Sequence, residues 1–423
     1  MADKTSVGKN TLDKSKIQLS LSNKLFNKNI FYIVLLVMVF FDFTFVNHNI
    51  FSPYLDWQAC ELVVSYRFGF IKRGFLGSVL LVLKQVFNLD YYNSIVILHL
   101  AGEVIFTCSV LMFLIHIIKK CNDSRVNLIV VLFMCFHLTG FYYYDWGELD
   151  IFLIPITLLI LLIALKDKYL WMIPALTLLG IMIHEGYVMM YLGVVISCLL
   201  YKCLSFESIR QKYLRVIAVA IVLSGLLFIY FYFLSGRIIH IDNDDFINNA
   251  RTIIGENVRI QNLEYSYLGG KLPENPMWID GHPTMSFAMR LFSVIVTLVL
   301  CTPVLVYYIK FWKRIIHYRN IKPLYGMLVA FLPCLLTFPL IMVHTDQGRW
   351  FYNIVFSLFF IVFFIVLADW EIASKAIKDT LLLRPMEFLF ALLYFVVFLF
   401  PDKQFISVMN LYLFDSIFNL GIV

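Results

Sequence analysis

Charge is scarce in this sequence. Only 15% of the 423 residues are Asp, Glu, Lys or Arg, whereas 61% are hydrophobic and the mean hydropathy is +0.83. An average soluble domain carries about 25% charged residues, so the composition excludes an ordinary soluble domain. A membrane span needs ~20 mostly apolar residues, and about eleven such runs lie between Ile30 and Pro401. We therefore expect an all-α, polytopic transmembrane helix bundle of about 11–12 spans.

The sequence also lacks the spacings that hold metals or disulfides. None of its eight cysteines forms a Cys-x-x-Cys pair, so we expect neither a disulfide framework nor a zinc site. His184 and Glu185 do not begin a His-Glu-x-x-His signature, because the fifth position is Val188. We expect no cofactor and no metal. The net charge of +6 is a topology signal and does not indicate a nucleic-acid partner.

The few charges that are present alternate between two kinds of loop. One set of loops is basic, and cytoplasmic loops retain Lys and Arg because positive charge resists translocation. The pattern predicts a basic cytoplasmic tail at 1–29 and one membrane domain at 30–423, with outer loops at 49–92 and 236–284. The basic loops are 119–125, 166–168, 202–215, 310–322 and 375–384.

Two outer loops interrupt the run of spans. In the first loop we expect interfacial helices at 56–68 and 74–87, with their apolar faces toward the hydrocarbon of the membrane. In the second loop we expect irregular structure. A spanning helix at 74–90 is the alternative and would invert every later loop. Residues 404–423 are either a twelfth span or an outer-surface helix. The other spans are placed at about 30–48, 93–117, 127–144, 150–166, 170–184, 187–203, 214–235, 285–310, 323–343, 351–368 and 386–400.

Reactive side chains gather at the predicted outer ends of the spans. In the first outer loop, Asp56 lies near Arg67 and Arg73. Cations of this kind hold phosphates, and a carboxylate can serve as a base. The alternative is snorkelling to lipid headgroups, which we favour for Lys72 and Lys84. Because the outer clusters share one predicted membrane depth, we expect them to converge into a single pocket.

Three more outer clusters follow. His184 and Glu185 form a plausible base and orienting pair, with a satisfied helix-end pair as the alternative. A second cluster combines groups that grip phosphate with a ring that stacks on sugars, or it is an interfacial anchor; it consists of His344, Asp346, Arg349 and Trp350. The third cluster could bind a cation or cap a helix, and capping is simpler; it consists of Asp145, Trp146, Glu148 and Asp150.

Ionisable residues inside the predicted spans are few. His99 and Glu103 are four positions apart on one helix face and are expected to form a local pair. No series of such residues crosses the membrane, which argues against a pump or channel.

This arrangement resembles the integral-membrane glycosyltransferases of the GT-C superfamily. Within it, the chain looks most like the O-antigen and capsular polysaccharide polymerases of the Wzy type. The likeness covers the whole chain in topology and only short stretches in sequence. These stretches are Arg67 to Gly74, His184-Glu185, Asp346-Gln-Gly-Arg349-Trp350 and the outer loop with Arg237, Arg251 and Arg259.

The resemblance implies polymerisation of polyprenyl-diphosphate-linked oligosaccharides at the outer face of a bacterial inner membrane. The N-terminus would be cytoplasmic, and the partners would be the lipid-linked glycan, the bilayer and a chain-length regulator. The implied catalytic residues are Asp56, His184, Glu185 and Asp346. The implied substrate-binding residues are Arg67, Arg73, Arg237, Arg251, His344, Arg349, Trp350 and Trp146.

Three alternatives remain at this stage. The first is a GT-C enzyme that adds a single sugar from a polyprenyl-phosphate donor. The second is a flippase or transporter of the lipid-linked glycan, which needs a polar path through the bilayer. The third is a membrane O-acyltransferase, and it ranks last because its donor is usually cytoplasmic whereas His184 is predicted to lie outside.

Overall fold

The computed structural model describes residues 62–121, 123–141, 149–254, 278–279, 282–283, 287–343 and 347–381. Between the turns of these residues the regular structure is helical, apart from one antiparallel hairpin of two short strands. The elements of the first half are η3 (Tyr66–Phe68), α4 (Gly74–Phe87), α5 (Tyr91–Cys121), α6 (Ser124–Phe141), α7 (Asp150–Lys166), α8 (Met172–Ile183), α9 (Tyr187–Met190) and α10 (Leu192–Ser205).

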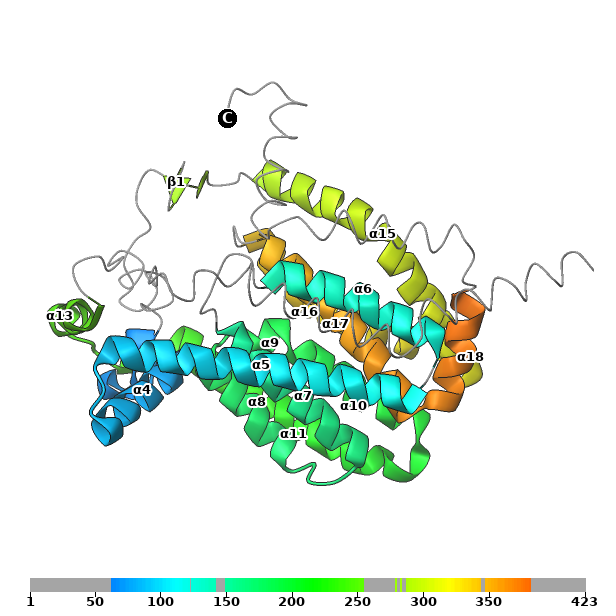
Figure 1. Ribbon diagram of the computed structural model, residues 1–423, viewed down its shortest axis with the longest axis horizontal. Coiled ribbons are helices and arrows are strands. Elements are labelled where there is room, and N and C mark those ends of the chain that lie inside the picture. Colours follow the sequence, from blue (N-terminus) through cyan, green and yellow to red (C-terminus); the bar gives the residue numbers. More distant parts are fainter. Residues whose placement is uncertain are drawn as a thin grey trace, which may run out of the picture.

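The second half continues with longer helices. Its elements are η4 (Glu207–Ile209), α11 (Arg210–Ile229), the π-helix η5 (Tyr230–Leu234), α12 (Ser235–Ile238), α13 (Asn243–Ile254), β1 (Trp278–Ile279), β2 (His282–Pro283), α15 (Phe287–Tyr318), α16 (Pro323–Val343), α17 (Gln347–Ala368) and α18 (Trp370–Thr380). Helices α4 and α13 lie at one end of α5, and α18 lies toward the other (Figure 1).

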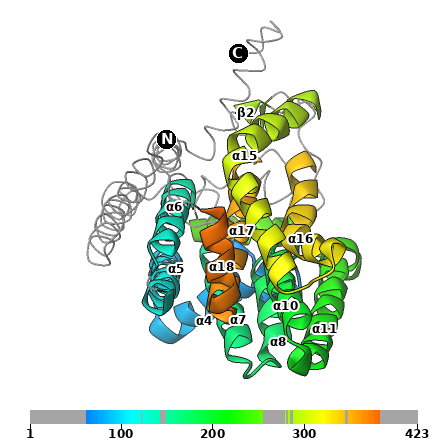
Figure 2. The same cartoon turned by 90° about the vertical axis from the view of Figure 1, so that its right-hand side faces the viewer.

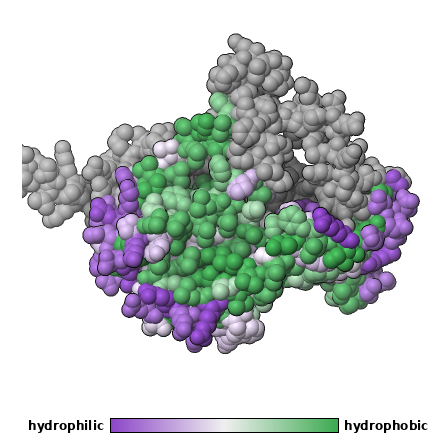
Figure 3. Space-filling model, turned by 180° about the vertical axis from the view of Figure 1, so that it is seen from behind, coloured by the Kyte–Doolittle hydropathy of each residue, from purple (hydrophilic) through white to green (hydrophobic). Residues whose placement is uncertain are grey.

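Three segments are long and apolar enough to cross a membrane: Asn93–Cys121, Glu207–Leu234 and Pro323–Leu340. Shorter apolar helices accompany them at Gly74–Phe87, Met172–Ile183, Leu192–Ser205 and Asn353–Ala368. A broad hydrophobic area covers the described surface seen in Figure 3, and hydrophilic residues gather at its margins. The protein is therefore helical, with apolar helices compatible with a membrane.

Helix α17 is the centre of the packing. Every side chain from Val355 to Leu367 is buried, and the helix contacts α5, α6, α7, α10, α15 and α16 (Figure 2). Phe133 of α6 packs against Phe356 and Phe363 with ring centroids 5.2 and 5.3 Å apart. Helices in lipid gain little from apolar burial alone. Close packing of these rings helps to hold α17 in place.

One close approach fixes α4 against the segment that precedes it. A Cβ at Gly77 would lie 2.0 Å from the backbone oxygen of Val64 and 2.7 Å from that of Leu62. No larger residue fits there. The hydroxyl of Ser78 accepts the backbone N–H of Tyr66 at 2.8 Å, which secures the same crossing.

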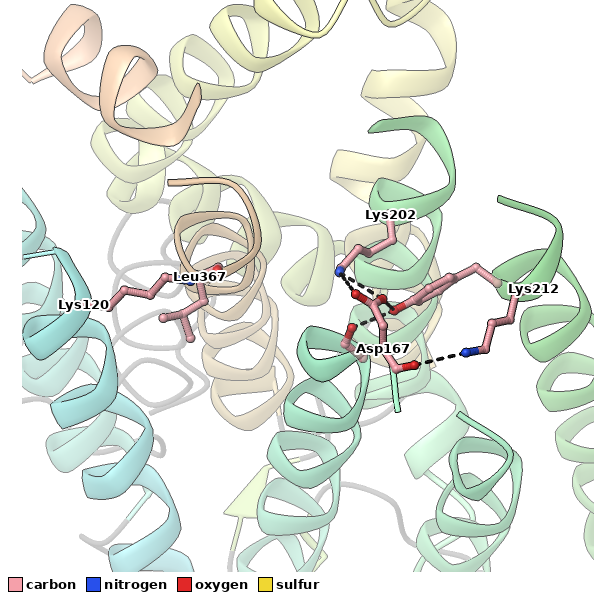
Figure 4. Close-up of polar contacts among 7 residues, drawn as sticks. Lys120, Asp167, Lys202, Lys212 and Leu367 are labelled. Atoms are coloured by element: carbon pink, nitrogen blue, oxygen red, sulfur yellow. Dashed lines mark hydrogen bonds and ion pairs between the residues drawn. The ribbon is translucent and has the colours of Figure 1, made fainter. Parts of the chain in front are cut away.

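The basic loops meet at one end of the bundle. Lys202 Nζ lies 3.1 Å from both carboxylate oxygens of Asp167, and Lys212 donates to the Asp167 backbone oxygen at 3.1 Å (Figure 4). In the same way, Arg319 Nε donates to Asp369 Oδ2 at 2.6 Å. Phe206 joins the two groups, because its ring lies 5.4 Å from Lys202 Nζ and 4.9 Å from Arg319 Cζ.

Other basic residues at this end bond to backbone oxygens. Lys120 donates to the oxygen of Leu367 (Figure 4), and Arg125 donates to that of Leu381 at 2.9 Å. Loops predicted to lie on one side of a membrane are thus tied to one another.

Several predicted bounds agree with the structure and two predictions are wrong. Helices α7 and α16 have the expected bounds of 150–166 and 323–343, and α4 matches 74–87. The interfacial helix predicted at 56–68 is not continuous over its described part, because residues 64–65 are not helical and 66–68 form a 3-10 turn. The 236–284 loop is not wholly irregular, because α13 forms within it and buries Phe246 and Ala250.

Gly77→Ala should lower the thermal unfolding temperature of the detergent-solubilised protein, because the added methyl group forces a backbone shift that costs about 1–3 kcal/mol. Gly225→Ala in α11 is the matched control. Nothing lies within 4 Å of its added Cβ, so the better helix propensity of Ala should stabilise by about 0.5–1 kcal/mol. An unchanged melting temperature in Gly77→Ala would contradict the close approach.

Candidate functional site

A bidentate ion pair joins the segment before α4 to the turn between α8 and α9. Arg73 Nε lies 2.9 Å from Glu185 Oε2, and its Nη2 lies 2.9 Å from Oε1. The Glu185 side chain is only 2% exposed and that of Arg73 is 16% exposed. Two parallel charge-assisted bonds of this kind fix the guanidinium in plane as well as in position.

The backbone at Arg73 is strained. It has φ 58° and ψ 6°, in the left-handed region, and it is the N-cap residue of α4. This conformation costs a non-glycine residue about 1–2 kcal/mol. Such strain persists only where the surroundings impose it, and it is concentrated at functional sites. Here the bidentate bond to Glu185 helps to hold Arg73 in place.

The turn that carries Glu185 depends on a glycine. His184 ends α8 with extended backbone, φ −152° and ψ 119°. A Cβ at Gly186 would lie 2.9 Å from both Cε1 and Nδ1 of His184, so a larger residue would displace the folded-back imidazole. The Gly186 N–H then donates to His184 Nδ1 at 2.9 Å.

That hydrogen bond determines which ring nitrogen of the neutral His184 imidazole carries the proton. Because Nδ1 accepts a hydrogen bond, the neutral imidazole carries its proton on Nε2. The contact of 3.8 Å between Nδ1 and Glu185 Oε2 is therefore not an ion pair in this state. His184 presents Nε2–H as a hydrogen-bond donor, and it could accept a proton at Nδ1 only by giving up the bond to Gly186.

A second cation and a ring complete the site. Lys72 Nζ lies 5.9 Å from the centre of the Tyr232 ring, within cation–π range. Tyr232 belongs to the π-helix that ends α11, and π-helical turns are frequent at functional sites. Phe70 packs on the neighbouring Phe231 ring at 5.3 Å. We call Lys72, Arg73, His184, Glu185 and Tyr232 the cationic cluster.

The electrostatics of the cationic cluster favour an anion. Burial alone would raise the pKa of Glu185, but the adjacent Arg73 guanidinium, followed by His184 and Lys72, holds that pKa well below its ordinary value. Glu185 is therefore ionised at neutral pH and is a weak proton acceptor. The two cations Lys72 and Arg73 outnumber the one carboxylate, so the cluster carries a net positive charge.

The structure brings together some of the residues predicted for the site. Arg73, His184 and Glu185 meet, although the sequence separates Arg73 from the other two by more than 100 positions. Asp150 is buried and accepts the hydroxyl of Tyr191 at 3.1 Å. It is the first residue of α7, whose N-cap position is Leu149, and capping of this helix by the Asp150 side chain stays a prediction.

Other predicted residues lie elsewhere in the described part of the chain. Arg67 is exposed and donates to Asn249 Oδ1 of α13 at 3.2 Å, and Arg237 and Arg251 are exposed. Arg349 is in the first turn of α17, and Trp350 after it is buried. Residues outside the described ranges are Asp56, Asp145, Trp146, Glu148, His344 and Asp346.

Two members of the cationic cluster were not predicted. The sequence favours headgroup snorkelling for Lys72 and places Tyr232 within the span predicted at 214–235. The signal for Lys72 was its position next to Arg73. No signal in the sequence distinguishes Tyr232, because the π-helix that turns its ring toward Lys72 exists only in the folded chain.

The fold and the cluster define a helical protein with membrane-compatible helices and a buried ion pair bordered by cationic and aromatic groups. Comparison with models of protein families, with curated proteins and with solved structures finds no match to the chain.

Glu185→Gln should destabilise the protein by about 3 kcal/mol, because it leaves the Arg73 charge without its partner in a largely buried place. The double variant Arg73→Leu/Glu185→Leu should lose less than the sum of the two single variants, as measured by thermal unfolding. Additive losses would contradict a direct pair.

The pH dependence gives a second check on this pair. The lowered pKa of Glu185 means that its contribution is complete above the unfolded value of about 4.3 and is lost only as pH falls through the lower folded value. The stability difference between the wild type and Glu185→Gln should therefore stay constant from about pH 5 to 8.

Proposed function

We propose that the protein is a multi-pass enzyme of a bacterial inner membrane that polymerises polyprenyl-diphosphate-linked oligosaccharides by glycosyl transfer. The observation that carries the proposal is the cationic cluster, in which a strained Arg73 is fixed by a buried Glu185 beside Lys72. A net positive site next to apolar, exposed side chains suits a ligand with a phosphate head and a hydrocarbon tail.

The exposed side chains beside the cluster support an amphiphilic substrate. Tyr232, Phe233 and Leu234 of the π-helix are all exposed, as is Phe70. Tyr232 also contacts Lys72. A soluble sugar nucleotide would gain nothing from this apolar border, whereas a lipid carrier would gain both the charge contact and the apolar one.

The chemistry needs a leaving group held by cations and a route for one proton. The acceptor hydroxyl oxygen attacks the anomeric carbon, the bond from that carbon to the carrier diphosphate breaks, and the hydroxyl proton passes to a base. Lys72 supplies charge to the diphosphate, and Arg73 is aligned by Glu185 for the same purpose. The Nε2–H of His184 can donate to a diphosphate oxygen. Asp56 and Asp346 remain the proposed bases.

The test is an analysis of the lipid-linked and finished glycans of the cells. Deleting the gene should abolish long chains while single capped units remain. Lys72→Met should reduce polymer by about 10–100-fold, because a hydrogen bond to a charged group contributes about 1.5–3 kcal/mol. The matched control is Lys84→Met on the exposed side of α4, which should keep full-length chains. Normal chain length in the deletion strain would reject the function.

The proposed topology has the N-terminus in the cytoplasm and the 236–284 loop outside. It is supported by the mutual bonding of the basic loops at one end of the bundle. Asn248 and Asn320 are both exposed. In intact cells, an impermeant thiol reagent should label Asn248→Cys and not Asn320→Cys, with the parent protein as the background. The reverse pattern would overturn the orientation.

A further inference from the structure

The central helix α17 carries polar side chains in its most buried part. Asn353 is 1% exposed and Ser357 is 0% exposed. Neither the amide oxygen and nitrogen of Asn353 nor the hydroxyl of Ser357 has a hydrogen-bond partner in the described residues. Because the two residues are four positions apart, they lie on one face of the helix. Trp350, three positions before Asn353, is buried on that face as well.

A carboxylate on α5, that of Glu103, lies at the same height along the bundle as these residues of α17. Phe113 of α5 packs against Phe360 of α17 with ring centroids 6.1 Å apart. Lys120 of α5 bonds to Leu367 of α17. In both contacts the two residue numbers differ by 247 (360 − 113 and 367 − 120). Both helices rise about 1.5 Å per residue, so this register places Glu103 level with Trp350. Glu103 is 7% exposed, and its Oε2 has no hydrogen-bond partner in the part of the chain described.

Leaving these groups unbonded is costly. Each buried polar group without a partner costs about 1–3 kcal/mol, and native proteins rarely tolerate them without a reason. Elsewhere in this bundle some buried hydroxyls do bond: Ser197 donates to the Val329 oxygen at 2.8 Å, and Thr337 donates to that of Met189 at 2.8 Å. Others, such as that of Ser224, are single unbonded groups among the described residues. What distinguishes the level of Glu103 and Asn353 is that four atoms without a bond to the described part of the chain gather there: Glu103 Oε2, Asn353 Oδ1 and Nδ2, and Ser357 Oγ.

The chemistry of the set indicates the kind of ligand. An amide offers both donor and acceptor, a hydroxyl offers both, and a carboxylate accepts. None of these side chains is a cation, so the set does not suit a phosphate. The Trp350 ring gives an apolar face of the kind that packs on sugar rings. A neutral ligand with several hydroxyl groups would match all of these groups.

We propose that Glu103, Trp350, Asn353 and Ser357 form a sugar-binding subsite within the bundle, separate from the cationic cluster. The assignment to a sugar rests on the proposed function. In that setting the cationic cluster holds the phosphate part of a lipid-linked glycan, and this subsite holds a sugar unit. The rival occupant is ordered water, which would satisfy the same groups.

The first arm of the experiment compares stability in purified, detergent-solubilised protein. Asn353→Leu keeps the side-chain volume and removes the polar atoms, so it should raise the melting temperature by about 2 °C or more. Ser357→Ala should also raise it. Ser197→Ala is the matched control and should lower it, because that hydroxyl is bonded. A lower melting temperature in Asn353→Leu would overturn the proposal, since the amide would then be satisfied within the fold.

The second arm tests the ligand. Glucose, galactose, N-acetylglucosamine and rhamnose are added separately, with trimethylamine N-oxide as a hydroxyl-free osmolyte control. At least one sugar should raise the melting temperature of the wild type beyond the osmolyte effect, and Asn353→Leu should abolish that rise. If no sugar does so, or if Asn353→Leu responds like the wild type, the groups hold water only and the subsite is rejected.

This arm also separates the two proposals. A gene deletion without effect on glycans, combined with a sugar response that depends on Asn353, would reject the polymerase function and keep the subsite. A deletion that abolishes long chains, combined with full-length chains in Asn353→Leu, would keep the function and reject the subsite.

Discussion

The bidentate bond between Arg73 and Glu185 is the interaction on which the arrangement of the cationic cluster depends. It connects two segments more than 100 positions apart, fixes a left-handed Arg73 at the start of α4 and keeps a buried carboxylate ionised. A buried pair contributes little net stability over a well-packed apolar pair, but the loss of either partner is costly. The pair therefore fixes the positions of the two side chains more than it stabilises the fold. A site that must hold its groups in place requires such fixed positions.

The remaining architecture separates two kinds of polar chemistry. At one end, Lys202, Asp167, Arg319 and Asp369 satisfy one another across several loops, with Phe206 between them. At the other, the charges of Lys72 and Arg73 exceed that of Glu185. Between the two ends, phenylalanines of α5, α6 and α17 interlock. The described bundle is held by this packing and by its polar ends.

The sequence predicted the bounds of several helices, but it predicted less well which segments pack against one another. Long apolar runs with turn residues between them predicted the bounds of α7 and α16 to the residue. The 56–68 prediction failed because a periodic apolar pattern cannot distinguish a short helix from a segment that packs against α4 through Gly77. Helix α13 was missed because its polar composition resembles a loop, and its apolar side is visible only once Phe246 meets Val63 and Val64.

By itself, the sequence determined that the chain is helical and apolar enough for a membrane, that its basic loops alternate, and that Arg73 and the His184–Glu185 pair are unusual. Only the tertiary structure decided which of these residues meet. It paired Arg73 with Glu185, gave His184 its tautomer through Gly186, turned Tyr232 toward Lys72 and left Asn353 buried in the central helix. The physical reason is that charge and hydropathy act along the chain, whereas hydrogen bonds and burial depend on which segments the packing brings together.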